Sequence, residues 1–351
     1  MRVLILGLGS MGKRRIRNLK QLGVEHITGY DTRPDRGWHA RDAYGIEILD
    51  DFNWDIVAGF DAVLICTPPD QHMEAAVECA KRGTHFFTEL NFVKDGLDEL
   101  LSILEDSGEK FVAAPSCSLR YHPCVKKMKE LFGQDPMGKP YCFIHHFGEY
   151  LPYWHPWEPI QDFYVSKRPT GGARDIVAFD LEFLMHLFGD PVAVQGFGAN
   201  TGALGVDIDD NFQFVVKFSS GVTGSVLIDV LQRKPNRYFR TITENGTVIW
   251  DDWDQQRLKL IYEQQPAGSP SLPEHKPEYV EEEIVLSDRE TDWTGSQFEQ
   301  IDFSSIMYIE EMTAFLDAVE GRRQYPKTFA DENTKIRTIY QLEADHGHTG
   351  S

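Results

Sequence analysis

Three glycines near the start of the chain have the spacing with the clearest chemical meaning. Residues 7–12 read G-x-G-x-x-G, directly after the apolar stretch 3–6 and at the opening of a helical stretch at 13–22. In such a loop the first glycine permits a tight turn, the second lets the backbone approach a pyrophosphate, and the third lets helix and strand pack closely. The helix N-terminus adds amide donors for the phosphates. The predicted dinucleotide-binding residues of this loop are Gly7, Leu8, Gly9, Ser10, Met11 and Gly12.

An aspartate follows the next apolar stretch at the distance expected for recognition of the adenosine ribose. Asp31 lies roughly 20 positions after the last glycine of the loop. Its carboxylate would accept hydrogen bonds from the ribose hydroxyls and repel a 2′-phosphate, so we expect NAD rather than NADP. Arg33 is the feature that favours NADP, because an arginine there can bind the 2′-phosphate. Asp31, Thr32 and Arg33 are predicted cofactor residues.

A second polar group is expected at the same edge of the sheet. The apolar stretch 62–66 runs into Thr67, Pro68 and Pro69, and His72 follows three residues later. Ligands of open α/β sheets bind outside the carboxyl ends of the strands, so these four residues are also predicted to contact the cofactor. Taken alone, a histidine such as His72 is more typical of a helix start than of a catalyst.

The elements that must position these residues change character along the chain. Up to about residue 118, short apolar runs alternate with amphipathic ones, which indicates a doubly wound parallel sheet. Later, strands joined by tight turns indicate an open antiparallel meander; we predict them at 192–199, 212–218, 222–231, 238–243, 247–250 and 257–262. The fold class is therefore an α/β Rossmann domain followed by an α+β domain with a large open, mainly antiparallel sheet.

The predicted domains are 1–118, which binds NAD(P), and 119–343, which binds substrate and mediates oligomerisation. A tail, 344–351, follows, and the helix at 307–320 is expected to pack back toward the first domain. An open sheet leaves one face needing cover, so we expect a homo-oligomer, either a dimer or a tetramer.

Composition excludes several classes of partner. The chain has 351 residues, with 55 Asp plus Glu against 35 Lys plus Arg, for a net charge of −20. That field repels nucleic acid and acidic membranes, so neither is an expected partner. No run of about 18 apolar residues is present to span a bilayer. Five cysteines without a CxxC pair favour a reducing compartment, and we expect a cytoplasmic protein.

These motifs resemble the Gfo/Idh/MocA family (glucose–fructose oxidoreductase, inositol dehydrogenase, rhizopine catabolism). The likeness covers nearly the whole chain, and beyond the motifs above it includes 83–89, 119–123, 171–173 with Asp175, and 308–311. The resemblance implies an NAD(H)-dependent oxidoreductase that transfers a hydride to or from a sugar or sugar derivative. It also implies that Glu89 holds the nicotinamide side of the cofactor.

The sequence departs from the family pattern at two catalytic positions. The family usually carries Glu-Lys-Pro where this chain has Glu89, Leu90 and Asn91, and it usually has a histidine at the position of Phe179. Neither leucine nor phenylalanine can transfer a proton. Three hypotheses follow: other groups move the proton, or NAD is used transiently for epimerisation or elimination, or the protein is a catalytically silent sensor of NAD and sugar.

Residues 145–175 offer side chains suited to a sugar, because aromatic rings pack on its apolar faces while charged groups and amides bind its hydroxyls. Basic side chains in an acidic protein also suggest an acidic sugar or a nucleotide sugar, since an arginine can clamp a carboxylate. The predicted substrate-binding residues are Arg120, Tyr121, Trp154, Trp157 and Arg174.

The missing proton carriers need replacements. His155 and Tyr164 are the predicted acid or base, with Lys167 behind them, because histidine titrates near neutrality and a tyrosine beside a cation can serve a dehydrogenase. Asp175 is predicted to orient the substrate or its proton acceptor. No metal is expected: His145 and His146 are potential ligands, but adjacent residues of a strand point to opposite faces.

Overall fold

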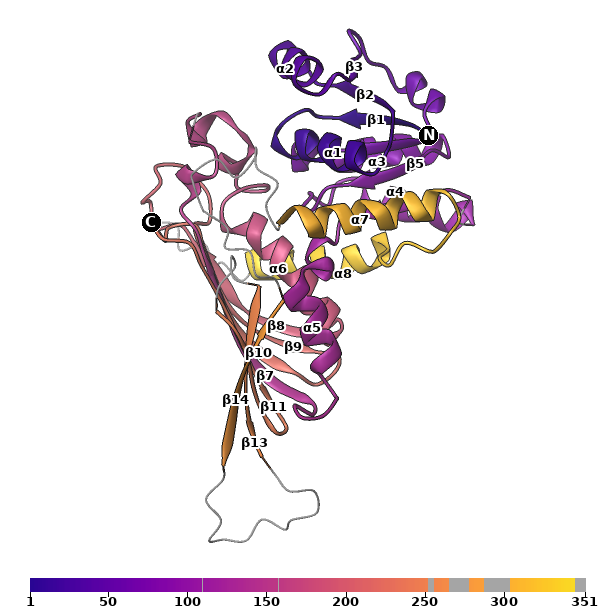
Figure 1. Cartoon of the computed structure of the whole chain (residues 1–351). Coiled ribbons are helices and arrows are strands. Elements are labelled where there is room, and N and C mark those ends of the chain that lie inside the picture. Colours follow the sequence, from indigo (N-terminus) through magenta and orange to yellow (C-terminus); the bar gives the residue numbers. More distant parts are fainter. Residues whose placement is uncertain (109, 157, 252–255, 265–277, 287–303, 345–351) are drawn as a thin grey trace. The chain divides into compact units, whose positions relative to one another are not determined.

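The computed structural model describes residues 1–108, 110–156, 158–251, 256–264, 278–286 and 304–344. The chain forms two compact units, coloured along the sequence in Figure 1. Unit 1 comprises Met1–Tyr121, Pro169–Gly171 and Trp293–Arg337, and unit 2 comprises His122–Arg168, Gly172–Asp292 and Thr338–Ser351.

Unit 1 is built on a six-stranded parallel sheet in the order β3-β2-β1-β4-β5-β6. The strands are β1 Arg2–Leu6, β2 His26–Tyr30, β3 Glu47–Ile48, β4 Ala62–Ile65, β5 His85–Thr88 and β6 Ala113–Pro115. The helices are α1 Ser10–Gln21, α2 Pro34–Tyr44, α3 His72–Lys81, α4 Leu97–Ser107 and α7 Ser304–Val319, and the boundary between the units falls within α8, Phe329–Ala344. The chain direction across the sheet reverses beside β1, the point where such sheets bind ligands.

The core of unit 1 explains why these runs become buried strands. Central strands β1 and β4 are apolar along nearly their whole length because helices cover both faces of a parallel sheet. Late in the chain, α7 contributes Met312, Phe315 and Leu316 to the same core as Val3 and Leu64. A Rossmann sheet is thus completed by a helix roughly three hundred residues away in sequence.

Unit 2 is built on an eight-stranded sheet in the order β14-β13-β12-β11-β7-β10-β9-β8. The strands are β7 Pro140–Gly148, β8 Pro191–Ala199, β9 Asn211–Phe218, β10 Thr223–Asp229, β11 Asn236–Thr243, β12 Gly246–Trp250, β13 Arg257–Glu263 and β14 Tyr279–Val285. The helices α5 Pro123–Leu131 and α6 Ala173–Phe188 belong to this unit. A parallel unit followed by a mainly antiparallel sheet confirms the predicted fold class.

The predicted meander is wrong at β7, and it also omits β14. β7 inserts between β10 and β11 and pairs parallel with β10, so the sheet is mixed rather than a continuous meander. This strand is difficult to recognise in the sequence. Its buried face consists of Phe143, His145 and Phe147, and the histidine interrupts the apolar pattern.

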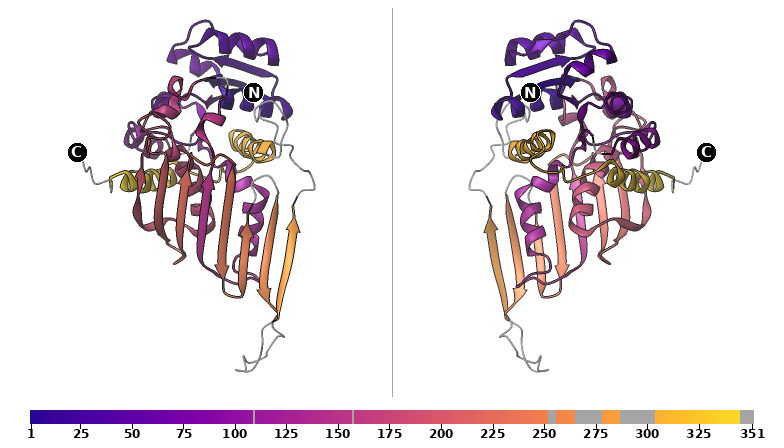
Figure 2. Two further views of the ribbon diagram at one scale, coloured as in Figure 1. Left: turned by 90° about the vertical axis from the view of Figure 1, so that its left-hand side faces the viewer. Right: turned by 90° about the vertical axis from the view of Figure 1, so that its right-hand side faces the viewer.

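Helices cover one face of the unit 2 sheet. Figure 2 (left) shows the strands in front of α5, with none of the described helices lying across that open face. Among the described residues, the exposed apolar side chains of the open face include Ile144, Phe197, Val215 and Ile242. Burial of such a surface would favour self-association.

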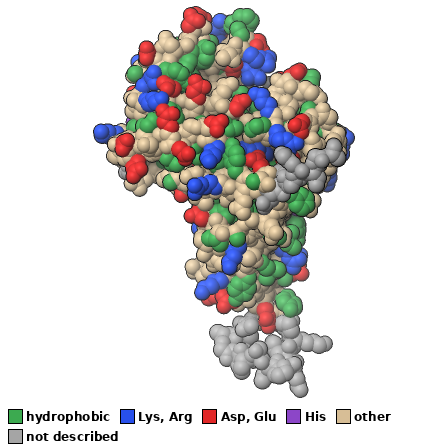
Figure 3. Space-filling model, turned by 180° about the vertical axis from the view of Figure 1, so that it is seen from behind, with side chains coloured by type: hydrophobic (Ala, Val, Ile, Leu, Met, Phe, Trp, Pro, Cys, Tyr) green, Lys and Arg blue, Asp and Glu red, His purple; other side chains and the backbone are tan. Residues whose placement is uncertain are grey.

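The surface shows mixed charges. On the face drawn in Figure 3, acidic and basic side chains of the described residues are interspersed and form no continuous basic stripe. No helix among the described residues is long and apolar enough to cross a membrane.

Candidate functional site

The glycine loop after β1 leaves room for a ligand at one position. Gly7 has φ +89°, and a Cβ there would lie 2.5 Å from the carbonyl oxygen of Cys66; a Cβ on Gly12 would lie 2.0 Å from the oxygen of Gly7. These two glycines are required by the fold itself. A Cβ on Gly9 would meet only Arg36, at 3.7 Å, so the protein's own packing does not require glycine there. Close approach of a phosphate does require glycine at position 9, and residues 7–12 therefore fit a dinucleotide.

The first turn of α1 is prepared for an anion. Gly9 is the N-cap residue and provides no side-chain hydrogen bond, and the first turn contains no acidic residue. The amides of Ser10 and Met11 therefore remain suited to phosphate oxygens at the positive end of the helix.

Asp31, at the end of β2, is held in place from two sides. Its Oδ2 accepts a hydrogen bond from the amide of Leu8 (2.7 Å), and its Oδ1 accepts one from the amide of Arg33 (2.8 Å). The Arg33 guanidinium itself pairs with Asp35, while Arg36 lies 3.7 Å from Asp31. The carboxylate is thus fixed beside the glycine loop. Arg36, which the sequence analysis did not single out, lies beside both Gly9 and Asp31.

Replacing Asp31 with serine is expected to weaken NADH binding about 10–100-fold and to improve NADPH binding. The reason is that hydrogen bonds to a charged group contribute about 1.5–3 kcal/mol, and the repulsion of a 2′-phosphate disappears. Fluorescence titrations with both reduced cofactors measure the change. Asp35→Ser is the matched control, since Asp35 is exposed and pairs with Arg33. Equal effects of the two variants would contradict the assignment.

His72, at the start of α3, is buried and links two loops. Its Nε2 lies 2.7 Å from the carbonyl oxygen of Thr67, and its Nδ1 lies 2.8 Å from that of Asn91. Burial lowers the pKa of His72, against the two carbonyl oxygens, which favour the cation. The imidazole therefore joins the end of β4 to the loop after β5. Both of these contacts are with the protein backbone.

Glu89, after β5, belongs to a buried ionic network. Arg15 of α1 donates from Nε and Nη2 to the Glu89 carboxylate (2.5 and 3.0 Å) and from Nη2 to Glu311 of α7 (2.7 Å). Glu311 also accepts hydrogen bonds from Ser116 Oγ and from the amide of Cys117. Burial raises the pKa of Glu311, against the neighbouring Arg15 cation, which lowers it. One arginine thus serves two buried carboxylates, and it ties α1 to β5 and α7.

The departure from Glu-Lys-Pro alters the backbone as well as the side chains. Asn91 has φ 64°, which a proline, fixed near −65°, cannot adopt. Its Nδ2 donates to the carbonyl oxygen of Thr170 (2.9 Å), and its own carbonyl oxygen contacts His72. Leu90 is half-buried beside it. Proline therefore could not replace Asn91 without a change of the backbone conformation at this position.

Two of the predicted catalytic residues meet in unit 2. Tyr164 lies in a short 3₁₀ turn, Tyr164–Ser166, and its hydroxyl donates to Oδ2 of Asp175, at the start of α6 (3.2 Å). His155 hydrogen-bonds to Glu158 (3.1 Å) and stacks on Phe163, the neighbour of Tyr164. Lys167 is exposed. The Tyr164–Asp175 pair can pass a proton, since a phenol can relay one to a carboxylate, and the His155–Glu158 pair is the second arrangement here with that chemistry.

A buried ionic triad holds α6 on the sheet. Asp180 of α6 accepts from His145 Nε2 of β7 (2.7 Å) and from Arg237 Nη1 of β11 (2.8 Å). Burial opposes ionisation of Asp180, but Arg237 and His145 outweigh it and lower the pKa of this carboxyl. His146, on the opposite face, pairs with Asp229 instead. The helix that carries Asp175 therefore has a fixed register against the strands.

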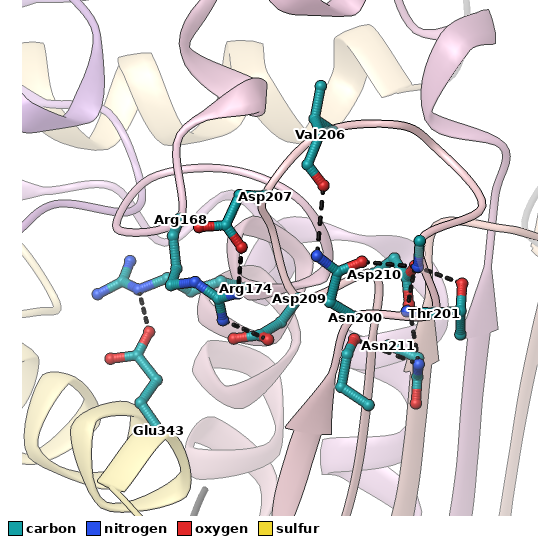
Figure 4. Close-up of polar contacts among 12 residues, drawn as sticks. Arg168, Arg174, Asn200, Thr201, Val206, Asp207, Asp209, Asp210, Asn211 and Glu343 are labelled. Carbon is teal, nitrogen blue, oxygen red and sulfur yellow. Dashed lines mark hydrogen bonds and ion pairs between the residues drawn. The ribbon is translucent and has the colours of Figure 1, made fainter. Parts of the chain in front are cut away.

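The predicted substrate-binding cations already have partners within the chain. Arg174 is buried and donates from Nε to Glu343 (2.7 Å), as Figure 4 shows. Arg120 donates to the carbonyl oxygen of Pro326 (2.9 Å). The guanidinium that was expected to clamp a substrate carboxylate thus holds one of the protein's own, which removes the main support for that role of Arg174.

The aromatic candidates are distributed between the units. Tyr121 lies in unit 1, where burial raises the pKa of its hydroxyl. Trp154 is half-buried in unit 2, and its indole N–H has no hydrogen-bond partner in the structure. Trp157 lies outside the described residues. Among the described residues, no group of three or more His, Cys, Asp or Glu could hold a metal ion.

Sequence reasoning missed several of these residues. Arg15 and Glu311 interact with partners far away in sequence. Arg36 lies about one helical turn beyond the predicted cofactor residues Asp31, Thr32 and Arg33. The one local signal was the dense basic run at 13–17 immediately after the glycine loop. A basic residue that faces the sheet there requires a buried carboxylate partner.

Comparison with known families decides the relationship. The model of an oxidoreductase family with an NAD-binding Rossmann fold, GFO/IDH/MocA, matches residues 1–110, and the model of the GFO/IDH/MocA C-terminal domain matches residues 125–249. The chain belongs to this family. The resemblance read from the motifs is confirmed, and with it the expected cofactor, NAD. As a GFO/IDH/MocA protein, the chain is an NAD-binding oxidoreductase.

Relatives within the family align with much of this chain. Myo-inositol 2-dehydrogenase of Thermotoga maritima is 25% identical over 287 residues, covering 77% of this chain and 80% of the relative. Levoglucosan dehydrogenase of Pseudarthrobacter phenanthrenivorans is 23% identical over 227 residues, covering 56% and 57%. A solved levoglucosan dehydrogenase in complex with NADH has a TM-score of 0.77 at 17% identity, covering 98% of this chain and 97% of that one. That likeness concerns the GFO/IDH/MocA fold.

UDP-N-acetylglucosamine 3-dehydrogenase from Acidithiobacillus ferrooxidans also shares the fold. Its TM-score is 0.72 at 17% identity, and the match covers 98% of this chain and 96% of that one. Family members of one architecture therefore carry names with quite different sugar-related substrates, so the fold does not select the substrate.

Proposed function

We propose that this oxidoreductase transfers a hydride between NAD(H) and a carbinol or carbonyl carbon of a sugar or sugar derivative, with Tyr164 and Asp175 handling the proton. The observation that carries the proposal is the hydrogen bond between the Tyr164 hydroxyl and Asp175, in a chain that lacks the usual lysine and histidine. Residues 7–12 and Asp31 would hold the dinucleotide, whose nicotinamide ring supplies the hydride acceptor or donor.

The proton steps follow from the pair. In the oxidation direction, the substrate hydroxyl gives its proton to Oη of Tyr164 as that oxygen passes its own proton to Oδ2 of Asp175. The carbon loses a hydride and becomes a carbonyl carbon, and the carboxylic acid of Asp175 later releases the proton to solvent. In the reduction direction the same two groups deliver the proton to the forming alkoxide. No group at positions 90 or 179 is needed for this sequence.

The substrate class rests on weaker support than the reaction type. Relatives named for inositol and levoglucosan make a polyhydroxylated ring the natural substrate class. Tyr153 and Trp154, beside His155, supply aromatic surface of the kind that packs on such rings. The narrower hypothesis of an acidic or nucleotide sugar stays a prediction, and it now depends on the exposed Lys167 rather than on Arg174.

A spectral titration tests the proposed function. Denaturation of the purified protein and analysis of the released dinucleotide first establish the redox state of any bound cofactor. The holoprotein is then titrated with neutral sugars, polyols, their uronic acids and nucleotide sugars while the reduced-nicotinamide band is monitored. We expect a lasting absorbance change with at least one compound. Sugar binding without any absorbance change would support the silent sensor, and a transient change without net redox turnover would support epimerisation or elimination.

Self-association is proposed through the open face of the unit 2 sheet. Cys142, Ile144, Val215 and Ile242 line a shallow hollow on it, and its exposed apolar area is suited to a second copy. We expect sedimentation of the wild-type protein to give a dimer or tetramer. The double variant Ile144→Asp, Val215→Asp should give monomers, because burying unpaired charges is costly. Exposed Trp38 in α2 of unit 1 offers the control, Trp38→Asp. An unchanged oligomer in the double variant would place the interface elsewhere.

A further inference from the structure

The segment that connects Tyr164 to Asp175 is folded back on itself by backbone bonds. The amide of Lys167 donates to the carbonyl oxygen of Tyr164 (3.1 Å), and the amide of Gly172 donates to that of Val165 (3.1 Å). Both bonds are local and leave the middle of the segment on the surface. Something else must therefore fix the orientation of Tyr164 relative to Asp175.

Within unit 2, Arg168 makes a long-range contact. Its Nη1 donates to Oδ1 of Asp209 (2.7 Å), and its Nη2 donates to Oδ1 of Asp207 (2.6 Å), as Figure 4 shows. Both aspartates lie in the loop between β8 and β9. The two partners are unequal: the side chain of Asp209 is 8% exposed and that of Asp207 is 81% exposed. The carboxylate of Asp209 is therefore the better shielded partner, and water competes less for it than for Asp207.

Asp209 also holds the first residue of α6. Its carbonyl oxygen accepts a hydrogen bond from the amide of Ala173 (2.9 Å), two residues before Asp175. A Cβ on Gly172 would lie 2.5 Å from the same oxygen, so only glycine permits this approach. One residue of the β8–β9 loop thus binds Arg168 through its side chain and the start of α6 through its backbone. Asp210 anchors that loop in turn, accepting from the amide and hydroxyl of Thr201.

We propose that Arg168 is a positioning residue that keeps Tyr164 within hydrogen-bonding distance of Asp175 by joining the segment 163–172 to Asp209. The inference rests on the proposed function, since it assigns a task to a pair that moves the proton. Misplacement of a reacting group by about 1 Å can cost about 100-fold in rate. An arginine suits this task because its rigid, planar guanidinium presents its donors in a fixed geometry, whereas the ammonium of a lysine is a point charge on a flexible stem.

The kinetic test compares four variants of the full-length protein. Arg168→Ala is expected to lower kcat about 10–100-fold with KM little changed, and Asp209→Asn to lower it less, because the backbone bond to Ala173 remains. Arg168→Lys should recover part of the loss. Asp207→Asn is the matched control and should stay within about 2-fold of wild type, since its pair with Arg168 is exposed. Equal losses for Asp207→Asn and Asp209→Asn would overturn the assignment.

A double-mutant cycle separates positioning from general stability. If Arg168 acts through Tyr164, Arg168→Ala in a Tyr164→Phe background should lower kcat little further, whereas independent effects would multiply. Multiplicative losses would overturn the proposal. An unchanged kcat in Arg168→Ala, together with a lowered kcat in Tyr164→Phe, would also overturn this proposal. That result would leave the proposed function intact.

Hydrogen exchange tests the same contact without turnover. Arg168→Ala should speed exchange at the amides of Lys167, Gly172 and Ala173, while Asp207→Asn should not. If the wild-type protein transfers no hydride to any sugar, the proposed function fails and this measurement alone decides whether Arg168 orders the segment. Unchanged protection in Arg168→Ala would overturn the inference.

Discussion

Replacing Tyr164 by phenylalanine is expected to lower kcat about 10²–10⁴-fold, the range that a positioned acid or base contributes. The variant keeps the aromatic ring and removes only the hydroxyl that donates to Asp175. Asp175→Asn should cause a loss of similar size, because the amide cannot take the proton. Initial rates of NADH formation with a sugar identified by titration measure both effects, and NADH binding should stay close to that of wild type.

The controls identify which group moves the proton. Tyr153→Phe makes the same change at an exposed tyrosine of the same unit and should leave kcat within about 2-fold of wild type. His155→Gln and Lys167→Met test the two other predicted proton carriers. Full activity in Tyr164→Phe, together with a large loss in His155→Gln, would move the acid–base role to the histidine and its partner Glu158.

Removal of the Arg15 guanidinium is expected to cost about 3–5 kcal/mol of unfolding free energy, the loss observed when one partner of a buried ion pair is deleted. Arg15→Ala leaves the carboxylates of Glu89 and Glu311 without the cation that they share, in a fully buried position. Urea denaturation followed by tryptophan fluorescence measures the loss. Dinucleotide affinity should fall as well, because Arg15 ties α1 to β5.

Arg17→Ala provides a control on the same helix. Arg17 is less buried than Arg15 and donates a hydrogen bond to the hydroxyl of Tyr44, so its loss should cost about 0.5–1.5 kcal/mol. Adding Glu311→Gln to Arg15→Ala should restore part of the stability by removing one buried charge. Equal destabilisation by Arg15→Ala and Arg17→Ala, or no recovery in the double variant, would show that the two carboxylates do not depend on Arg15.

The parts of this protein that were predictable from sequence are those whose physics is local. The glycine loop could be recognised because a tight turn, a strand end and a helix start all fall within residues 7–12, and the structure places Gly7 and Gly12 in positions where a side chain does not fit. Alternating runs revealed both sheets. β7 was missed because the pattern depends on apolar side chains, and His145 is buried through a bond to Asp180 instead.

The candidate catalytic pair could be named but not assembled from sequence. Tyr164 and Asp175 are eleven positions apart, and nothing in that spacing distinguishes them from His155 or Lys167. Arg174 shows the opposite error. Its position beside Asp175 suggested that it binds a substrate carboxylate, whereas the structure pairs it with Glu343, near the C-terminal end of the chain.

The sequence by itself determined the family, the dinucleotide fold and the expected cofactor, NAD, because each depends on residue types at fixed local spacing. Tertiary structure alone decided which charges are already neutralised within the protein and which polar groups meet. The partners of Arg15, Arg168 and Arg174 lie between 39 and 296 residues away. A charged side chain can be available to substrate or committed to the fold, and only the three-dimensional position of its counter-charge distinguishes the two.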